Sequence, residues 1–239
     1  ALAGRLFERR VDGLLVAGGS DLGTAVRPYV ENQVPVIAAM SKGASDIDVP
    51  LIMTSEYAAI RSAFASLARH GHTSVAYFGS SRTVYTPRPG YVSQASAEEG
   101  IVCQMSFLPE STDGEAMAGH IANAMRAPTS ATALVVNHSL LSPFMTAIRS
   151  LKLRIPEDVS VFTMSDYRQL DAFLDPPLSA VHSDGVAMGV NCARILIQWI
   201  ESGDPPPPVS DMNLSSWLET KSIADRATAL AALAAADSH

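Results

Sequence analysis

The chain has 239 residues, of which 47% are hydrophobic and 17% are charged, and its formal net charge is −7. A chain of this size forms one large domain or two small ones and has ample material for a core. The acidic balance argues against a broad nucleic-acid-binding surface within these residues.

No uninterrupted apolar stretch is long enough to span a bilayer. The first residues also lack the charged-then-apolar pattern of a secretory signal, so a cytoplasmic protein is expected. Cys103 and Cys192 lie far apart and outside any CxxC or metal-ligand spacing, which predicts buried free thiols.

Short apolar strands alternate along the chain with amphipathic helical stretches. This alternation is typical of an α/β fold, in which helices cover both faces of a parallel sheet. The predicted strands are Gly13–Ala17, Val34–Ala38, Leu51–Met53, Val75–Phe78, Ile101–Phe107, Ala133–Val136, Val159–Met164 and Ser179–Val181.

Apolar residues at helical spacing mark the helices between these strands. The stripes are Ile60-Phe64-Leu67, Met117-Ile121-Met125 and Met188-Cys192-Ile195-Trp199. We expect all three to be core faces. The first ends at Gly71 and the last at Gly203, before a run of four prolines.

The two ends of the chain read differently from its middle. Residues 2–10 resemble the end of a helix that leads into the first predicted strand, with no strand before it. The chain is therefore expected to begin inside a domain. The alanine-rich residues 226–239 are expected to form a frayed helix or a tail.

Motifs for catalysis are missing from the sequence. It contains no GxSxG, HExxH, Walker or GxGxxG pattern, and no nucleophile has a base at motif spacing. His70 and His72 stand two residues apart, which does not place both on one helix face for a metal. We predict that the protein is not an enzyme and has no metal or cofactor.

Polar residues follow several of the predicted strands. In open α/β sheets, ligands lie beyond the carboxyl ends of the strands. The residues expected there are Ser20, Ser80, Ser81, Asn137, Ser165 and Asp166. Hydroxyl, amide and carboxylate groups suit a neutral polyhydroxy or heterocyclic ligand. Such residues also cap helices, which is favoured for Ser80 and Ser81 and stays open for Asn137 and Asp166.

Several segments occur in an order that carries a family resemblance. They are VDGLLVAG (11–18), VPVIAA (34–39), LARHGHTSVAYFGS (67–80), LRIPEDVSVFTMSD (153–166) and DPPLSAVHSDGVAMG (175–189). In this order they resemble the effector-binding domain of the lactose-repressor (LacI/GalR) family of bacterial transcriptional regulators. The likeness runs from about Val11 to about Ile223.

The resemblance implies a periplasmic-binding-protein-like fold of two α/β subdomains joined by three crossovers, with a small effector between them. The crossovers are expected near residue 71, near residues 182–183 and after the proline run. The N-terminal subdomain would comprise residues 1–70 and 183–208, and the C-terminal one residues 71–182 and 209–225. The helix-turn-helix head of the family would lie before this chain.

The resemblance also suggests effector contacts. Asn137 matches an asparagine that bonds effector hydroxyls in sugar-responsive members. Ser165 occupies a contact position that is usually acidic or an amide, with Asp166 beside it. Arg88 is the nearest counterpart of the effector-gripping arginine, although it lies one residue too close to the next glycine. Ser183 stands at a crossover position that often faces the pocket.

One family position differs in a way that bears on the ligand. The family's aspartate after the third strand is Ser55 in this chain. A site that replaces carboxylates with serines loses bidentate acceptance of adjacent sugar hydroxyls. The ligand is then less hydroxylated than a hexose, or the pocket has changed its use.

The resulting hypothesis is the sensing and dimerising module of a DNA-binding regulator. It is expected to bind a sugar, a nucleoside or a similar polar metabolite, to form a homodimer, and to reach operator DNA only through the head. A solute-binding protein of a transporter shares the fold and is the alternative. An enzyme is a third hypothesis, which lacks a visible reactive constellation.

Overall fold

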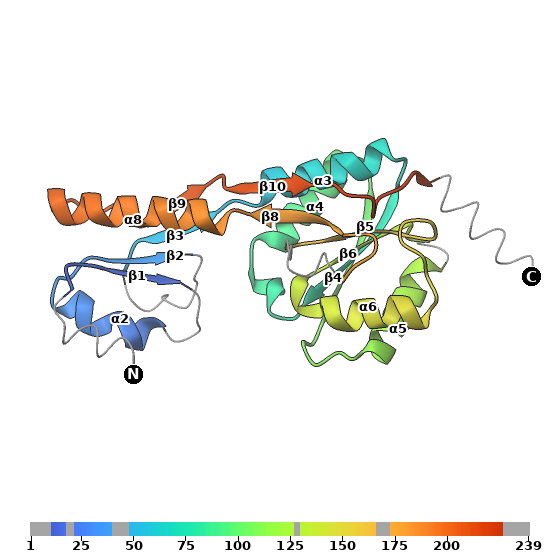
Figure 1. The fold of residues 1–239 in the computed structure, drawn as a ribbon, viewed down its shortest axis with the longest axis horizontal. Coiled ribbons are helices and arrows are strands. Elements are labelled where there is room, and N and C mark those ends of the chain that lie inside the picture. The colour runs from blue at the N-terminus through green and yellow to red at the C-terminus, as the bar shows by residue number, and fades with distance from the viewer. Residues whose placement is uncertain (1–10, 18–21, 40–47, 127–129, 166–172, 227–239) are drawn as a thin grey trace, which may run out of the picture. The chain divides into compact units, whose positions relative to one another are not determined.

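The structure is a computed structural model that describes residues 11–17, 22–39, 48–126, 130–165 and 173–226 (Figure 1). These residues form two compact units. Unit 1 holds the described residues up to Ser55 together with Asp184–Leu214, and unit 2 holds Glu56–Ser183 and the described residues from Ser215 onward. The chain thus passes between the units three times, as predicted.

Unit 1 contains a four-stranded parallel sheet. Its strands, in spatial order, are β1 (Leu14–Ala17), β2 (Val36–Ala39), β3 (Leu51–Thr54) and β9 (Val209–Met212). Its helices are α2 (Leu22–Glu31) and α8 (Gly185–Ser202). Alternate residues of β2 serve the two faces, since Val36 and Ala38 belong to the α2 cluster whereas Ile37 and Ala39 belong to the α8 cluster.

Helix α8 has defined ends and two unlike apolar faces. The Asp184 side chain accepts a hydrogen bond from Ala187 N (2.8 Å) at its start, and Gly203 ends it in the left-handed conformation. The predicted stripe, represented by the buried Met188 and Cys192, packs on the sheet. A second face leaves the side chains of Val186, Val190, Ile197 and Ile200 exposed.

Unit 2 is built on a six-stranded sheet with the order β10-β8-β7-β6-β4-β5. Only β10 runs antiparallel to its neighbour. The strands are β4 (Ser74–Ser80), β5 (Val102–Leu108), β6 (Ala133–Val136), β7 (Ser160–Thr163), β8 (Ser179–Ser183) and β10 (Ser215–Leu218). The helices are α3 (Tyr57–Arg69), α4 (Arg88–Glu98), α5 (Gly114–Met125) and α6 (Leu141–Ser150), with short 3-10 turns η1 (Thr83–Tyr85) and η2 (His138–Leu140).

Helices cover both faces of this sheet, as Figure 1 shows. On β4, Ala76 and Phe78 belong to one core cluster with residues of α5 and α6, whereas Val75 and Tyr77 belong to the other with residues of α3 and α4. A sheet buried on both faces reads as continuous apolar runs, which is why the sequence predicted its parallel strands.

The predicted α/β fold class is confirmed, and every predicted strand is present within a few residues of its expected bounds. Strands β9 and β10 were not predicted. Their sequences, VSDM and SSWL, each contain two adjacent polar residues, and no residue of either strand is fully buried, so they lack the apolar run that marks the others. Among the described residues, no helix combines the length and apolar character needed to cross a membrane.

The observed division differs from the predicted one at two crossovers. Helix α3 was expected in the N-terminal subdomain, but Ile60, Phe64 and Leu67 pack in the core of unit 2, so the boundary falls after Ser55. The last boundary falls after Leu214 because β9 pairs with β3 of unit 1. The middle boundary lies one residue from the predicted position. Residues 1–10 and 227–239, on which the predictions about the chain's ends rest, lie outside the described residues.

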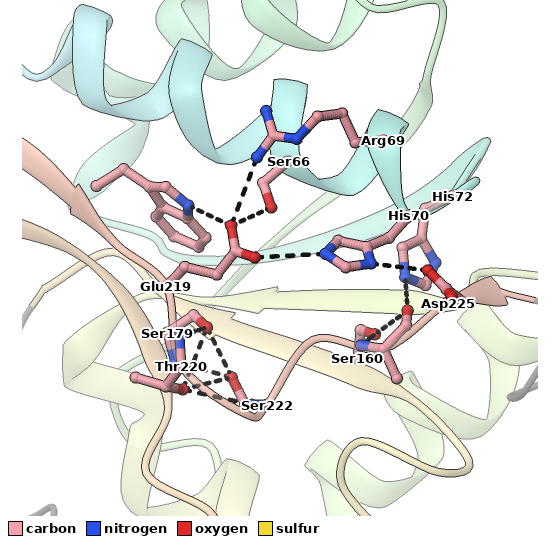
Figure 2. Close-up of polar contacts among 12 residues, drawn as sticks. Ser66, Arg69, His70, His72, Ser160, Ser179, Glu219, Thr220, Ser222 and Asp225 are labelled. Carbon is pink, nitrogen blue, oxygen red and sulfur yellow. Dashed lines mark hydrogen bonds and ion pairs between the residues drawn. The ribbon is translucent and has the colours of Figure 1, made fainter.

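Hydrogen bonds of three serines, Ser160, Ser179 and Ser222, hold the segment after β10 on the six-stranded sheet (Figure 2). Ser222 Oγ donates to Val161 O (2.7 Å) and accepts from Ser179 N (2.8 Å), and Val161 N donates to Ser222 O (2.9 Å). Ala224 N donates to Ser160 Oγ (3.0 Å). These contacts continue the sheet's hydrogen bonding beyond its regular strands.

His72 also holds this segment, through a hydrogen bond with Ala224. The residue is 1% exposed, and its ring Nε2 lies 3.0 Å from Ala224 O while Nδ1 lies 2.8 Å from Thr132 Oγ1. Because a carbonyl oxygen only accepts, Nε2 carries the proton and Nδ1 accepts from the threonine hydroxyl. Burial lowers the pKa of His72 to about 4, so the ring stays neutral in the folded protein over a wide pH range.

His70 lies close by and behaves in the opposite way. Its Nδ1 is 2.9 Å from Asp225 Oδ1 and its Nε2 is 3.3 Å from Glu219 Oε1. The hydrogen bond with Asp225 raises the pKa of His70. The stabilisation that this residue contributes is therefore complete below its unfolded pKa and is lost as pH rises through its folded value.

We expect acidification from pH 6.5 to 4 to lower the free energy of unfolding through His72. The unfolded chain takes up a proton at His72 below about pH 6.5, whereas the folded chain does so only near pH 4. A gap of this size costs up to about 3 kcal/mol. Denaturant unfolding across this range should show a shallower decline in His72→Gln, which keeps a donor but does not titrate. The exposed His120→Gln is the matched control, and an equal decline in all three proteins would contradict the assignment.

Candidate functional site

The carboxyl ends of the unit 2 strands bring several predicted residues to one edge of the sheet. Strand β6 lies between β4 and β7, with Val136 aligned with Phe78 on one side and Thr163 on the other. Asn137, which follows Val136, therefore lies between the ends of β4 and β7. This is the edge at which open α/β sheets bind ligands.

Two helix starts add an ion pair to unit 2. Glu56 precedes α3, and Arg88 is the first residue of α4, whose first turn also contains Pro89. Arg88 Nε donates to Glu56 Oε2 at 2.8 Å and Nη2 donates to Oε1 at 2.6 Å. The side chains are only 15% and 16% exposed. Such a two-point pair holds the starts of both helices together.

The environment keeps Arg88 charged. Burial by itself disfavours the cation, but the hydrogen bonds and negative charge of Glu56 outweigh it, and the pKa of Arg88 is raised. Neither bond to Glu56 uses Nη1 of the guanidinium. Arg88 thus keeps a donor that its carboxylate partner leaves unused.

Asn137 is fully buried and only half satisfied. Its Oδ1 accepts hydrogen bonds from Ser139 N (3.2 Å) and Ser139 Oγ (3.1 Å), which makes it the cap of η2. Its Nδ2 has no hydrogen-bond partner among the described residues. The side chain therefore combines a capping oxygen with a free donor, so capping does not exhaust the amide.

Tyr77 Oη is a second buried polar atom without a hydrogen-bond partner in the described parts of the chain. Burial raises the pKa of Tyr77, whereas the charge of Arg88 and weak hydrogen bonding with Thr83 and Asn137 lower it. Thr83 and Asn137 thus lie close to the hydroxyl, but neither reaches it with the distance and angle of a full hydrogen bond. An unsatisfied buried polar group costs about 1–3 kcal/mol, and here two lie in one neighbourhood.

His138 adds a neutral ring beside this group. Although the residue as a whole is exposed, burial around its ring and then the positive charge of Arg88 lower the pKa of His138. Near neutral pH the ring therefore adds no second cation to the site.

The remaining predicted contacts are less concentrated. Ser165 Oγ donates to Met164 O (2.6 Å), the carbonyl just before it. Ser183 Oγ lies 3.2 Å from Ser215 Oγ, its partner across β8 and β10. Ser20 and Asp166 lie outside the described residues.

Two residues of this site were missed in the sequence. Glu56 follows Ser55, the position where the family's aspartate was sought, so a one-residue shift in the comparison points to it. Tyr77 sits in an apolar strand, and its neighbours give no sign that its hydroxyl lacks a partner. Among the described residues, no group of three or more His, Cys, Asp or Glu side chains is placed to hold a metal ion.

The family model described as a periplasmic binding protein-like domain matches residues 64–219, which is more than half of the chain. The chain belongs to this family. Its resemblance to the effector-binding domains of LacI/GalR regulators is confirmed by the relatives that it matches.

Two relatives are named as an HTH-type transcriptional repressor and an HTH-type transcriptional regulator. The HTH-type transcriptional repressor PurR of Vibrio vulnificus is 26% identical over 215 residues, covering 87% of this chain and 63% of the relative. The HTH-type transcriptional regulator MalR of Streptomyces coelicolor is 27% identical over 216 residues, covering 86% and 62%. The chain thus spans a little under two thirds of the length of these relatives.

Solved structures share the periplasmic binding protein-like fold. A LacI family regulator from Bifidobacterium animalis has a TM-score of 0.71 at 20% identity, covering 93% of this chain and 82% of that one. A LacI family regulator from Enterococcus faecium with bound ribose has a TM-score of 0.72 at 17% identity, covering 94% and 83%. One from Arthrobacter in complex with lactose has a TM-score of 0.71 at 19% identity, covering 90% and 79%.

Removing the hydroxyl of Tyr77 should not destabilise the protein without ligand. In Tyr77→Phe the unsatisfied oxygen disappears, so we expect the free energy of unfolding to stay unchanged or to rise by up to about 1 kcal/mol. Ser222→Ala removes an equally buried hydroxyl that has partners, and it should cost about 1–3 kcal/mol. Chemical denaturation compares the two variants, and equal losses would show that Tyr77 Oη is satisfied.

Proposed function

We propose that this chain is the effector-sensing and dimerising part of a bacterial LacI-type transcriptional regulator. A small polar metabolite would bind at the carboxyl ends of the unit 2 strands. The observation that carries the proposal is the pair of buried, unpartnered polar atoms, Asn137 Nδ2 and Tyr77 Oη, at this edge of a LacI-type domain. A ligand oxygen would remove the cost of leaving them unpaired.

The residues proposed to touch the effector are those that the family comparison suggested, namely Asn137, Ser165, Asp166, Arg88, Ser183 and Ser20. To these we add Tyr77. Relatives that hold ribose and lactose support a ligand that carries hydroxyl groups. Hydroxyls both donate and accept, which suits a site of mixed amide, phenol and serine groups.

Regulation would follow from differential binding. An effector that binds one arrangement of the paired chains more tightly shifts the population toward it, with a typical coupling of about 1–3 kcal/mol. We propose a cytoplasmic homodimer that reaches operator DNA through a helix-turn-helix head. The relatives are longer than the part of them that this chain matches, and their names describe them as HTH-type regulators. Both facts support a helix-turn-helix head.

The alternative is a solute-binding protein that serves a transporter and shares the fold. The matched relatives are named as regulators, which favours the first reading over this one and over an enzyme. The two readings differ in a direct way, because only a regulator would couple sugar binding to the occupancy of operator DNA.

The site is tested by calorimetric titration with ribose, lactose and a purine base. Asn137→Ser keeps a capping oxygen but removes the amide donor, and we expect it to weaken binding about tenfold or more. Ser165→Ala should weaken it by a smaller factor. Asn123→Ala, on the exposed surface of α5, is the matched control and should leave affinity unchanged. Unaltered affinity in both site variants would remove Asn137 and Ser165 from the site.

A further inference from the structure

We infer that Glu56 sets the ligand class of this site, because by cancelling the charge of Arg88 it makes the site reject anions in favour of uncharged ligands. The inference deepens the proposed function and rests on it for the ligand being an effector. It goes beyond the family comparison, in which the arginine alone was expected to grip the ligand.

The geometry of the pair supports this role. Glu56 occupies the Nε and Nη2 edge of Arg88 with bonds of 2.8 and 2.6 Å, which is the edge that binds carboxylates and phosphates in a forked manner. Both side chains are largely buried, so neither can turn toward water without breaking the pair. An anionic ligand would have to displace Glu56 and leave its carboxylate buried without a partner.

The start of helix α3 also favours the position of the Glu56 carboxylate beside Arg88. Its carboxylate lies at the positive end of the α3 dipole, and it makes no capping bond of its own. An incoming anion would therefore compete with a carboxylate that lies near the helix start and is bound to the guanidinium. The pair as a whole carries no net charge.

The polar groups that Glu56 does not bind are suited to an oxygen atom of an uncharged ligand. Arg88 Nη1 is not used by Glu56, and Asn137 Nδ2 is a donor without a partner. Tyr77 Oη can both donate and accept, and it also lacks a hydrogen-bond partner among the described residues. The charges of Arg88 and Glu56 act on its pKa in opposite directions. A hydroxyl, ring oxygen or carbonyl of an uncharged ligand can meet these groups without adding charge.

Inorganic phosphate tests the inference without requiring the effector to be known. We expect phosphate at neutral pH to leave the unfolding temperature of the wild type unchanged relative to chloride of equal ionic strength. In Glu56→Gln the freed guanidinium should bind phosphate at least tenfold more tightly than in the wild type. The double variant Glu56→Gln/Arg88→Gln should lose this gain.

Glu110→Gln is the matched control, because Glu110 also pairs with an arginine, Arg82, but at 3.4 Å on the exposed surface. It removes the same negative charge and should not acquire phosphate binding. Phosphate binding in Glu110→Gln equal to that in Glu56→Gln would overturn the inference, since any lost carboxylate would then have the same effect.

A second measurement covers the case in which Glu56→Gln does not fold. Ribose and ribose 5-phosphate are compared on the wild type, and we expect the phosphorylated sugar to bind at least tenfold more weakly. Equal or tighter binding that is lost in Arg88→Gln would overturn the inference.

The outcomes separate this inference from the proposed function. If Glu56→Gln gains phosphate binding but the wild type binds no sugar or purine, the ligand-class inference stands and the proposed effector fails. If sugars bind through Asn137 and Glu56→Gln gains no phosphate binding, the proposed function stands and the inference is overturned.

Discussion

Burial of both faces of the six-stranded sheet is the constraint on which unit 2 depends. Helices α3 and α4 cover one face and α5 and α6 cover the other, so the middles of the central strands β4, β6 and β7 are apolar. Polar side chains can then meet only where strands end. The position of the candidate site is thus a consequence of the way the core is closed, because any chemistry must be placed at the sheet's edge.

At that edge the charged side chains are paired with each other, whereas two neutral polar groups have no partner. The charges of Arg88 and Glu56 satisfy each other within the protein, over bonds that use both carboxylate oxygens. The neutral groups Asn137 Nδ2 and Tyr77 Oη are left incomplete. Burying an unpaired neutral polar group costs far less free energy than burying an unpaired ion. The neutral groups can therefore lack a partner in the ligand-free protein, whereas the ions cannot.

The sequence predicted the parallel strands and the edge where the polar residues gather, because apolar runs and strand ends are local signals. It did not predict which sheet α3 covers, since a helical stripe at Ile60, Phe64 and Leu67 reveals a buried face but not its partner. It missed the Glu56–Arg88 pair for a similar reason. The two residues are far apart along the chain, and they meet only because the starts of α3 and α4 are brought together in the fold.

The late return of the chain to unit 2 has a consequence for its biosynthesis. Strand β10 and the segment that His72 and Ser222 hold are made after residues 184–214, which belong to unit 1. Until residues 215–226 have been synthesised, the β8 edge has no partner strand and Nε2 of His72 has no acceptor for its proton. Neither unit is therefore complete before most of the other has been made, because the segments of the two units alternate along the chain.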